Sequence, residues 1–296
     1  MLCEFRSKAE GTSDLLNYAM MVAKGVVLLK DGAFCSGWTY QGHDLNSADN
    51  SALEYLSASI SNILCQLGNG WMLHCDLFRR QSVGYPAAER SHFPEPVTRM
   101  IDEERRFQYE AEGAHFESEY TLILTYLPPS DIEAKVTRFF IDEEKKSKKN
   151  WSRILESYQE KMASLENLLS SFIRLERLND DDLLTCLHRD ITGLSHPVKL
   201  PKIPAYLDTY LGAQDLSGGL FPKIGNKFLR LITIDGFPME SEPGILQILD
   251  RLPIQFRWSN RFIFLEPSTA VAELKKYRRN WFQKRHGLLG LVREVM

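Results

Sequence analysis

Residues 25–40 read GVVLLKDGAFCSGWTY and predict a β-hairpin close to the start of the chain. Residues 25–30 are mostly apolar and partly β-branched, as is typical of a strand, and residues 33–40 form a second run of this kind. Asp31-Gly32 lies between the two runs. A type I′ turn needs positive φ at both central residues, which favours Asp-Gly. The sequence therefore predicts two antiparallel strands joined by a tight turn.

Downstream of the hairpin, helical and strand patterns alternate. Apolar residues at a spacing of three to four predict a helix before Gly68, and strict alternation predicts a strand before Pro128-Pro129. The predicted elements are a helix at 49–67, a strand at 71–78, a charged helix at 97–112 and a strand at 117–127. The first 130 residues thus predict an α+β module with mixed sheets and helices packed on one face.

The rest of the chain is predicted to carry long helices in the middle and at the C-terminus. Residues 143–150 (EEKKSKKN) suit a solvated helix segment or a hinge. The apolar face expected for a helix at 151–178 comprises Ile154, Leu155, Tyr158, Met162, Leu165, Leu168, Leu169 and Phe172. Further elements are predicted at 180–191 (helix), 228–234 (strand), 244–252 (helix), 255–265 (strand) and from Pro267-Ser268 onward (helix). The predicted division is 1–142, an N-terminal α+β module; 143–200, a helical segment; and 201–296, a second α/β segment ending in a basic helix.

Composition narrows the class of protein. The 296 residues are 44% hydrophobic and 25% charged, as in globular proteins, and the net charge is −3. Residues 268–296 hold seven basic and two acidic residues, a net charge of +5, which leaves −8 for the remainder. The five cysteines form no C-x-x-C pair, which disfavours a disulfide framework or a zinc knuckle. No signal-peptide order and no membrane-spanning run of about 20 apolar residues is found.

A search for catalytic motifs finds none. The nearest approach to a phosphate-binding P-loop is residues 219–227 (GLFPKIGNK), whose spacing is one residue too long and which lacks the Ser or Thr after the lysine. His188-Arg189-Asp190 resembles a kinase catalytic loop but has neither the downstream Asn nor a Gly-rich loop, so an ordinary helix end explains it better. The seven histidines are scattered. We therefore predict no catalytic, cofactor-binding or metal-ligating residue.

One surface motif remains in the predicted C-terminal helix, where residues 273–285 (ELKKYRRNWFQKR) interleave basic and aromatic side chains. Such a helix can contact an anionic membrane surface, a partner protein or nucleic acid. The alternative is a solvated basic face with its aromatic residues packed inward. The candidate surface, for which lipid or a partner is favoured over nucleic acid, comprises Lys275, Lys276, Arg278, Arg279, Trp281, Lys284 and Arg285.

An ordered series of short motifs over roughly residues 20–130 resembles the amino-terminal region of conjugal-transfer (type IV secretion) ATPases of the TrbE type, in the CagE/TrbE/VirB family. The most specific motif is IDEERR at 101–106, whose alternating charges suit an i,i+4 ion-pair face and a role in architecture or subunit contact. The others are GVVLLKDGAF (25–34), YQGHDL (40–45), LGNGWMLH (67–74), Arg79-Arg80, Tyr85-Pro86, EGAHFES (112–118), YTL (120–122) and LPP (127–129).

The resemblance implies an ATPase that powers a conjugation channel for DNA transfer from the cytoplasmic face of the bacterial inner membrane. In that family the amino-terminal half docks on the membrane complex and on neighbouring subunits, and a RecA-like carboxy-terminal half binds ATP and Mg²⁺. This chain has no Walker A or B motif, so no hydrolysis is expected of it alone, whether it is a truncated, split or excised domain. The implied partners are other type IV secretion proteins and further copies of the chain. A nucleotide-dependent enzyme and a nucleic-acid-binding module stay open as alternatives.

Overall fold

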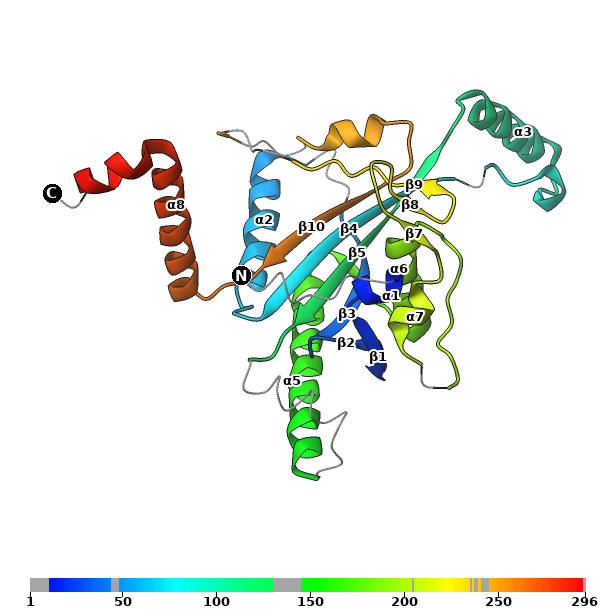
Figure 1. Ribbon diagram of the computed structural model, residues 1–296. Helices are drawn as coiled ribbons and strands as arrows, with labels where there is room; N and C mark the ends of the chain where they lie inside the picture. Colours follow the sequence, from blue (N-terminus) through cyan, green and yellow to red (C-terminus); the bar gives the residue numbers. More distant parts are fainter. Residues whose placement is uncertain are drawn as a thin grey trace.

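A computed structural model describes residues 11–43, 48–82, 84–129, 145–203, 205–234, 236, 239–240 and 245–294. Its centre is a seven-stranded sheet (Figure 1). In spatial order the strands are β1 (Tyr18–Ala23), β2 (Val26–Leu29), β3 (Phe34–Gln41), β5 (Phe116–Tyr126), β4 (Trp71–Gln81) and β10 (Phe256–Ile263), and β6 (Arg174–Arg177) pairs with the far half of β3. Every strand pair in the described residues is antiparallel, which corrects the prediction of mixed sheets within a confirmed α+β class.

The predicted hairpin is present as β2 and β3, but its turn differs from the prediction. Only Gly32 has positive φ (+85°), while Asp31 does not. The Gly32 amide donates to the Leu29 carbonyl (3.0 Å) and the Leu29 amide donates to the Ala33 carbonyl (2.8 Å). The connection is therefore a three-residue loop with glycine at its left-handed position. The Asp31 carboxylate accepts from the Ala33 amide (3.1 Å), which fixes the loop.

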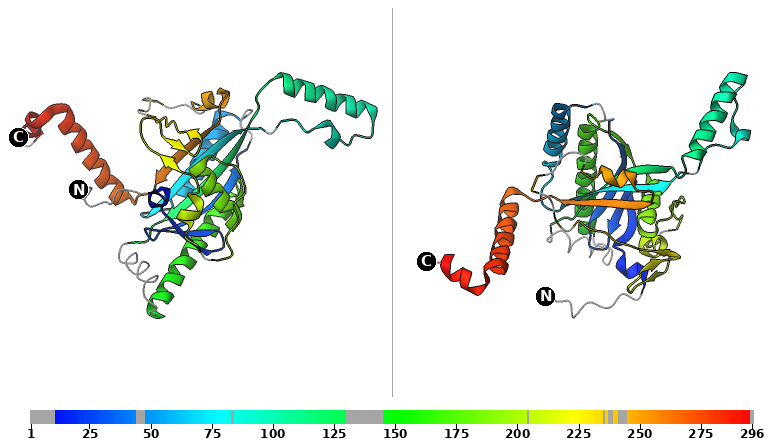
Figure 2. Two further views of the ribbon diagram at one scale, coloured as in Figure 1. Left: turned by 45° about the vertical axis from the view of Figure 1, so that its right-hand side comes forward. Right: turned by 90° about the horizontal axis from the view of Figure 1, so that it is seen from above.

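Helices cover both faces of the sheet, which corrects the prediction of helices on one face. On one face, α2 (Asn50–Leu64) and α5 (Lys145–Leu169) pack on the cluster that contains Phe34 and Trp38. On the other, α6 (Asp180–Thr192) and α7 (Leu207–Leu211) pack on the cluster that contains Val27 and Cys35. Figures 1 and 2 show the sheet between these two helical layers. The central strands are apolar on both sides for this reason, since neither side meets water.

The long middle helix ends earlier than predicted. α5 stops at Leu169, and the chain then forms β6, which lies inside the range predicted as helical. Tyr158, Met162, Leu165 and Leu169 are buried as predicted, whereas Leu168 is exposed. Pairing of Arg174–Arg177 with β3 satisfies backbone groups that a longer helix would have used internally. The helix predicted at 180–191 is confirmed as α6, with the Asn179 side chain accepting from the Asp182 amide (3.0 Å) as its N-cap.

The last third of the chain adds a strand to the same sheet. β10 matches the strand predicted at 255–265 and pairs with β4 along its whole length. The strand predicted at 228–234 is wrong beyond Phe228, where β9 (Lys227–Phe228) ends a small sheet with β7 (Leu216–Ser217) and β8 (Lys223–Ile224). The helix predicted at 244–252 is the 3₁₀ turn η3 (Gln247–Arg251). Strands from all three predicted segments thus share one sheet.

Two helices lie away from this body. α3 (Pro96–Ala111) sits at the tip of an extension of β4 and β5, with the short turn η2 (Ala88–Arg90) beside it, and α8 (Pro267–Glu294) follows β10. Figures 1 and 2 show the two helices projecting at opposite ends of the long strands. The short helix α1 (Thr12–Leu15) instead lies against α7. The sheet body therefore presents two separate projecting elements to its surroundings.

Gly25 joins β1 to β2 at a point of close backbone approach. Its φ is +65°, and a Cβ atom there would lie 2.7 Å from the Leu178 carbonyl oxygen. Gly25→Ala is therefore expected to lower the free energy of unfolding by about 2 kcal/mol, measured by urea denaturation. Gly113→Ala is the control, because Gly113 also has positive φ but has open space around it. A Gly25→Ala loss no larger than the control's would contradict the expected clash.

Candidate interaction surfaces and a buried charge cluster

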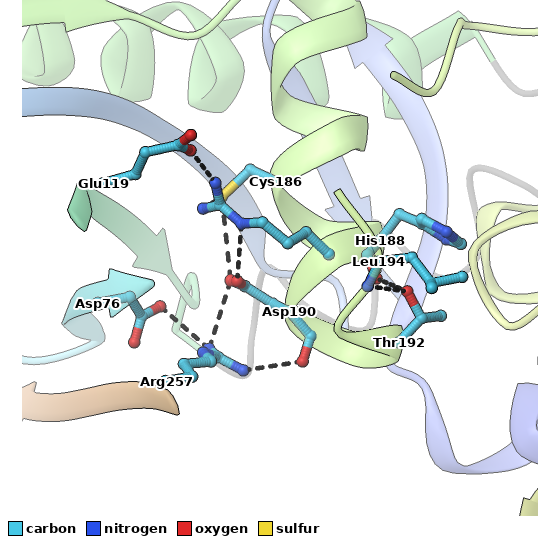
Figure 3. Close-up of polar contacts among 9 residues, drawn as sticks. Asp76, Glu119, Cys186, His188, Asp190, Thr192, Leu194 and Arg257 are labelled. Atoms are coloured by element: carbon cyan, nitrogen blue, oxygen red, sulfur yellow. Dashed lines mark hydrogen bonds and ion pairs between the residues drawn. The ribbon is translucent and has the colours of Figure 1, made fainter. Parts of the chain in front are cut away.

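A cluster of charged side chains lies where α6 meets β4, β5 and β10 (Figure 3). The Arg257 guanidinium, from β10, contacts the carboxylates of Asp76 (3.1 Å) and Asp190 (3.3 Å). It also donates to the backbone carbonyl of Asp190 (3.0 Å). Arg189 completes the cluster by pairing with Glu119 on β5 and stacking over the Phe78 ring at 4.7 Å from its centroid. These contacts connect three strands to one helix.

Burial controls the protonation of this cluster. Asp76 and Asp190 are nearly inaccessible, at 4% and 8% side-chain exposure. Desolvation raises the pKa of Asp190 to about 6, and the nearby Arg257 opposes that rise. Burial likewise raises the pKa of the Cys186 thiol to about 12, so this thiol stays protonated at neutral pH. Because these charged side chains pair with one another across α6 and three strands, the cluster acts as a structural clamp.

A pocket of about 650 Å³ opens beside the cluster, between the sheet end and residues 227–234. Asp190 and Arg257 form part of its wall, and Leu231 and Ile232 line its other side while remaining largely exposed to solvent.

The sequence motif at 188–190 has a structural role that its local spacing could not indicate. Arg189 pairs with Glu119, 70 residues away, and Asp190 with Arg257, 67 residues away, which a helix end alone does not predict.

The α3 arm, defined here as residues 84–115, is held together by Asp102. Its carboxylate accepts from the hydroxyls of Tyr85 and Ser91, both at 2.7 Å, and pairs with Arg106 at 3.3 Å. These hydrogen bonds lower the pKa of Asp102, with that from Tyr85 contributing most. The IDEERR motif thus includes the residue that fixes the loop against the helix.

We expect Asp102→Asn to loosen the arm without unfolding the body. The amide cannot accept two hydroxyl hydrogen bonds and pair with Arg106 as a carboxylate does. Limited proteolysis at neutral pH should therefore cut the loop at 84–95 faster in the variant, while the unfolding midpoint of the body stays unchanged. In the wild type the same loosening should occur only as pH falls through the lowered pKa of Asp102, because a depressed carboxyl pKa gives stability that is lost on acidification. Equal cleavage rates for variant and wild type would contradict this role.

The outward face of α3 is apolar and exposed. Four apolar side chains are between 48% and 68% exposed: Val97, Met100, Ile101 and Phe107. Met100 and Ile101 follow Val97 by three and four residues, and Phe107 follows them by seven and six residues. All four therefore fall on one side of the helix. The opposite side carries Asp102 and faces the loop. Single exposed apolar residues are common, but a row of four on a projecting helix is typical of an interaction surface.

α8 carries the surface residues singled out in the sequence. Lys275, Lys276, Arg278 and Arg279 are exposed, and Trp281 is 73% exposed. Leu274 (68%) and Tyr277 (65%) are exposed on the same side as Trp281, so these apolar groups do not pack inward on this chain. The side chains of Lys284 and Arg285 lie outside the described residues. Lys276 pairs with Glu273 (3.5 Å) at the surface, a contact that contributes little stability. The role of α8 as a binding surface stays a prediction.

Three further features of the sequence concern phosphate binding, metal binding and membrane insertion. Residues 219–227, the nearest approach to a P-loop, fold into β8 and β9 and the turns around them. Among the described residues, no group of three or more His, Cys, Asp and Glu side chains is arranged to hold a metal ion. No helix in the described segments of the chain is both long and apolar enough to cross a bilayer.

Relatives of the chain are found among conjugal transfer proteins. A conjugal transfer protein TrbE of Rhizobium radiobacter is 38% identical over 298 residues, which cover 96% of this chain and 36% of that protein. Sinorhizobium fredii has a probable conjugal transfer protein TrbE in two pieces. The first piece is 45% identical over 136 residues, which cover 46% of this chain and 89% of that piece. The second piece is 47% identical over 104 residues, or 35% of this chain and 16% of that piece.

A family model matches the same region as the motif series. Residues 25–134 match the model described as Type IV secretion system ATPase VirB4/TrbE, N-terminal domain. The chain spans about a third of the length of the Rhizobium relative, which aligns with nearly all of it. The chain therefore belongs to the VirB4/TrbE family of type IV secretion system ATPases.

Proposed function

We propose that this chain is the docking and assembly region of a conjugal-transfer ATPase. One observation carries the proposal: a packed sheet body projects two helices, α3 and α8, whose apolar faces are exposed at opposite ends. An enzyme domain would concentrate its chemistry in a cleft, whereas here the charged groups beside the 650 Å³ pocket are paired with one another. This architecture supports a module that works by contact.

The partners are other type IV secretion proteins at the inner membrane and further copies of the chain. The VirB4/TrbE membership supports this assignment, since the family model is that of a secretion-system ATPase. In α8, basic residues flank an exposed apolar stripe, which suits attachment to an acidic protein surface or to anionic headgroups. The chain accordingly works at the cytoplasmic face of the membrane, as a peripheral protein.

Membrane fractionation tests the proposal. The chain is expressed in cells with and without the other conjugation genes, and inner membranes are floated on a sucrose gradient. We expect most of the chain with the membranes only when the other genes are present. Recovery in the membrane-free fraction in both strains would refute docking, and equal membrane recovery in both would show direct lipid binding in place of a protein partner.

We expect no ATP hydrolysis by this chain. The alternative is a nucleotide-dependent enzyme, and calorimetry with Mg-ATP distinguishes the two. The stretch closest to a P-loop is occupied by β8 and β9 and their turn, and its Gly225 amide donates to the Asp215 carbonyl (2.9 Å) instead of facing an open cradle. We therefore expect no saturable heat at millimolar nucleotide. A saturable binding isotherm would favour the enzyme.

Nucleic-acid binding through α8 is a second candidate, because Tyr277 and Trp281 are exposed among basic residues. Exposed aromatic rings can stack on bases while Lys and Arg contact phosphates. A gel shift whose affinity falls steeply with salt, and which is lost when Lys275, Arg278 and Arg279 are replaced by Gln, would support this candidate. An absent or salt-insensitive shift would remove it.

A further inference from the structure

The strand order places α3 and α8 at opposite ends of one ribbon. β4 runs from Trp71 to Gln81, and its last residues pair with the first residues of β5 at the base of the α3 arm. β10 runs antiparallel to β4, so Ile263 lies opposite Met72, at the other end. α8 starts there, tied to the body by a hydrogen bond from the Asn69 side chain to the Thr269 hydroxyl (3.3 Å). Within one chain, the two helices therefore project away from each other (Figure 2).

The two exposed faces carry opposite charge. On α3, exposed Glu103, Glu104 and Glu110 lie among or beside Met100 and Phe107. Glu104 lies near the middle of the apolar row, where it accepts a hydrogen bond from Gln108 (3.1 Å). Among the basic residues of α3, Arg106 turns inward to Asp102, whereas Arg105 is exposed beside Ile101 and Arg99 is exposed further round the helix. The outward face of α3 is therefore apolar with Glu104 in its middle, and it has acids on one border and Arg105 on the other.

On α8, the exposed apolar row is Leu274, Tyr277 and Trp281, and the bordering charges are Lys275, Lys276, Arg278 and Arg279. One acid, Glu273, opposes them in the described residues of this face and pairs with Lys276. Two copies of α8 would bring like charges together, as would two copies of α3, whereas one helix of each kind is complementary in both apolar surface and charge.

We propose that α3 of one copy packs against α8 of the next copy, head to tail. This deepens the proposed function, on whose self-assembly it rests, by naming the two surfaces that meet. α3 is about 24 Å long at 1.5 Å per residue, which is enough for a contact of about four turns with the longer α8. The contact uses different surfaces on the two partners, so a pair keeps one free α8 on the first copy and one free α3 on the second. Such a contact closes into a ring or continues as an open chain of subunits.

Two charge-reversed forms of the full chain test this arrangement. Form X carries Lys275→Glu, Arg278→Glu and Arg279→Glu, and form Y carries Glu103→Lys, Glu104→Lys and Glu110→Lys. All six positions are exposed, so both forms should fold as the wild type does, which circular dichroism and thermal melting check. The control is a form with Glu54→Lys, Glu156→Lys and Glu160→Lys, which makes the same charge change as form Y on exposed positions of the body. Sedimentation velocity measures the assembly of each form alone and in mixtures.

We expect the wild type and the control to associate with rising concentration. X alone and Y alone should associate at least about tenfold more weakly, because acid then meets acid or base meets base. The equimolar mixture of X and Y should regain association, since every α3–α8 contact between the two forms is again complementary. Association of Y alone would indicate an α8–α8 contact, and association of X alone an α3–α3 contact; either result overturns the proposal.

A monomeric wild type at all accessible concentrations would also overturn it. That result would leave the docking function intact if the chain still floated with membranes in the fractionation experiment. A chain that associates through α3 and α8 but never floats with membranes would instead remove the docking function and keep the head-to-tail contact.

Discussion

Tyr158→Ala is expected to lower the free energy of unfolding by about 4 kcal/mol, the typical cost of removing a buried aromatic side chain. Tyr158 lies on α5, is 1% exposed, and packs against the sheet. Its ring lies 5.4 Å from Phe34 and 5.8 Å from Trp71, nearly parallel to the latter at 13°. The substitution removes the shared partner of both rings and leaves a cavity that neighbouring strands cannot close. Urea denaturation followed by tryptophan fluorescence measures the loss.

Tyr158→Phe is the matched control. The Tyr158 hydroxyl donates to the Leu124 carbonyl in the middle of the sheet (3.0 Å), and Phe removes that hydrogen bond while keeping the ring. The expected loss is about 1 kcal/mol, the net value of one hydrogen bond. If Phe and Ala cost the same, the aromatic packing between α5 and the sheet would not be the main source of stability at this position.

Arg257→Met is expected to cost about 3 kcal/mol, at the lower end for breaking a buried ion pair because the guanidinium is partly solvated. The change leaves the carboxylates of Asp76 and Asp190 buried without their shared cation. It also removes the bond from Arg257 to the Asp190 backbone, so the edge strand β10 loses its side-chain connection to α6. Thermal and urea unfolding measure the loss.

Asp190→Asn removes the charge of the Asp190 side chain but nearly keeps its size. It therefore separates the effect of charge on stability from the effect of packing in the cluster. Adding it to Arg257→Met removes one unpaired carboxylate, so the double variant should be more stable than Arg257→Met alone. A further loss in the double variant would contradict the clamp.

In the wild type, the pKa of Asp190 is raised to about 6 from 3.8, so its protonated form favours folding. The stability from this group is present below pH 3.8 and is lost as pH rises through about 6, and Asp190→Asn should remove that dependence.

Local patterns predicted the long elements well because their physical causes are local. Alternation placed the strand at 117–127 within one residue of β5, and apolar spacing placed the helix at 49–67 close to α2. β6 was missed because its four residues continue the helical pattern of α5 and become a strand only by pairing with β3. β1 was missed because it has no alternation, and all six of its residues are partly buried.

The interaction surfaces were predictable only to a degree. The basic and aromatic spacing in α8 was readable from the sequence, since it depends on one helix. The apolar face of α3 was not singled out, because its exposure depends on the way β4 and β5 extend beyond the body. The charge cluster was not predictable, because Asp76, Asp190 and Arg257 come together only when the sheet forms. No spacing rule relates residues that lie this far apart in the chain.

That this chain acts by contact is tested most directly with a purified, tagged chain and detergent-solubilised inner membranes from cells that carry the conjugation system. We predict that the wild type retains a membrane component at micromolar concentration. Leu274→Ala, Tyr277→Ala and Trp281→Ala together should reduce the retained amount at least about tenfold, as expected when several exposed anchors are lost. The control with Tyr55→Ala, Ile203→Ala and Tyr206→Ala, exposed elsewhere on the body, should retain it fully. Failure of the wild type to retain any component would contradict docking.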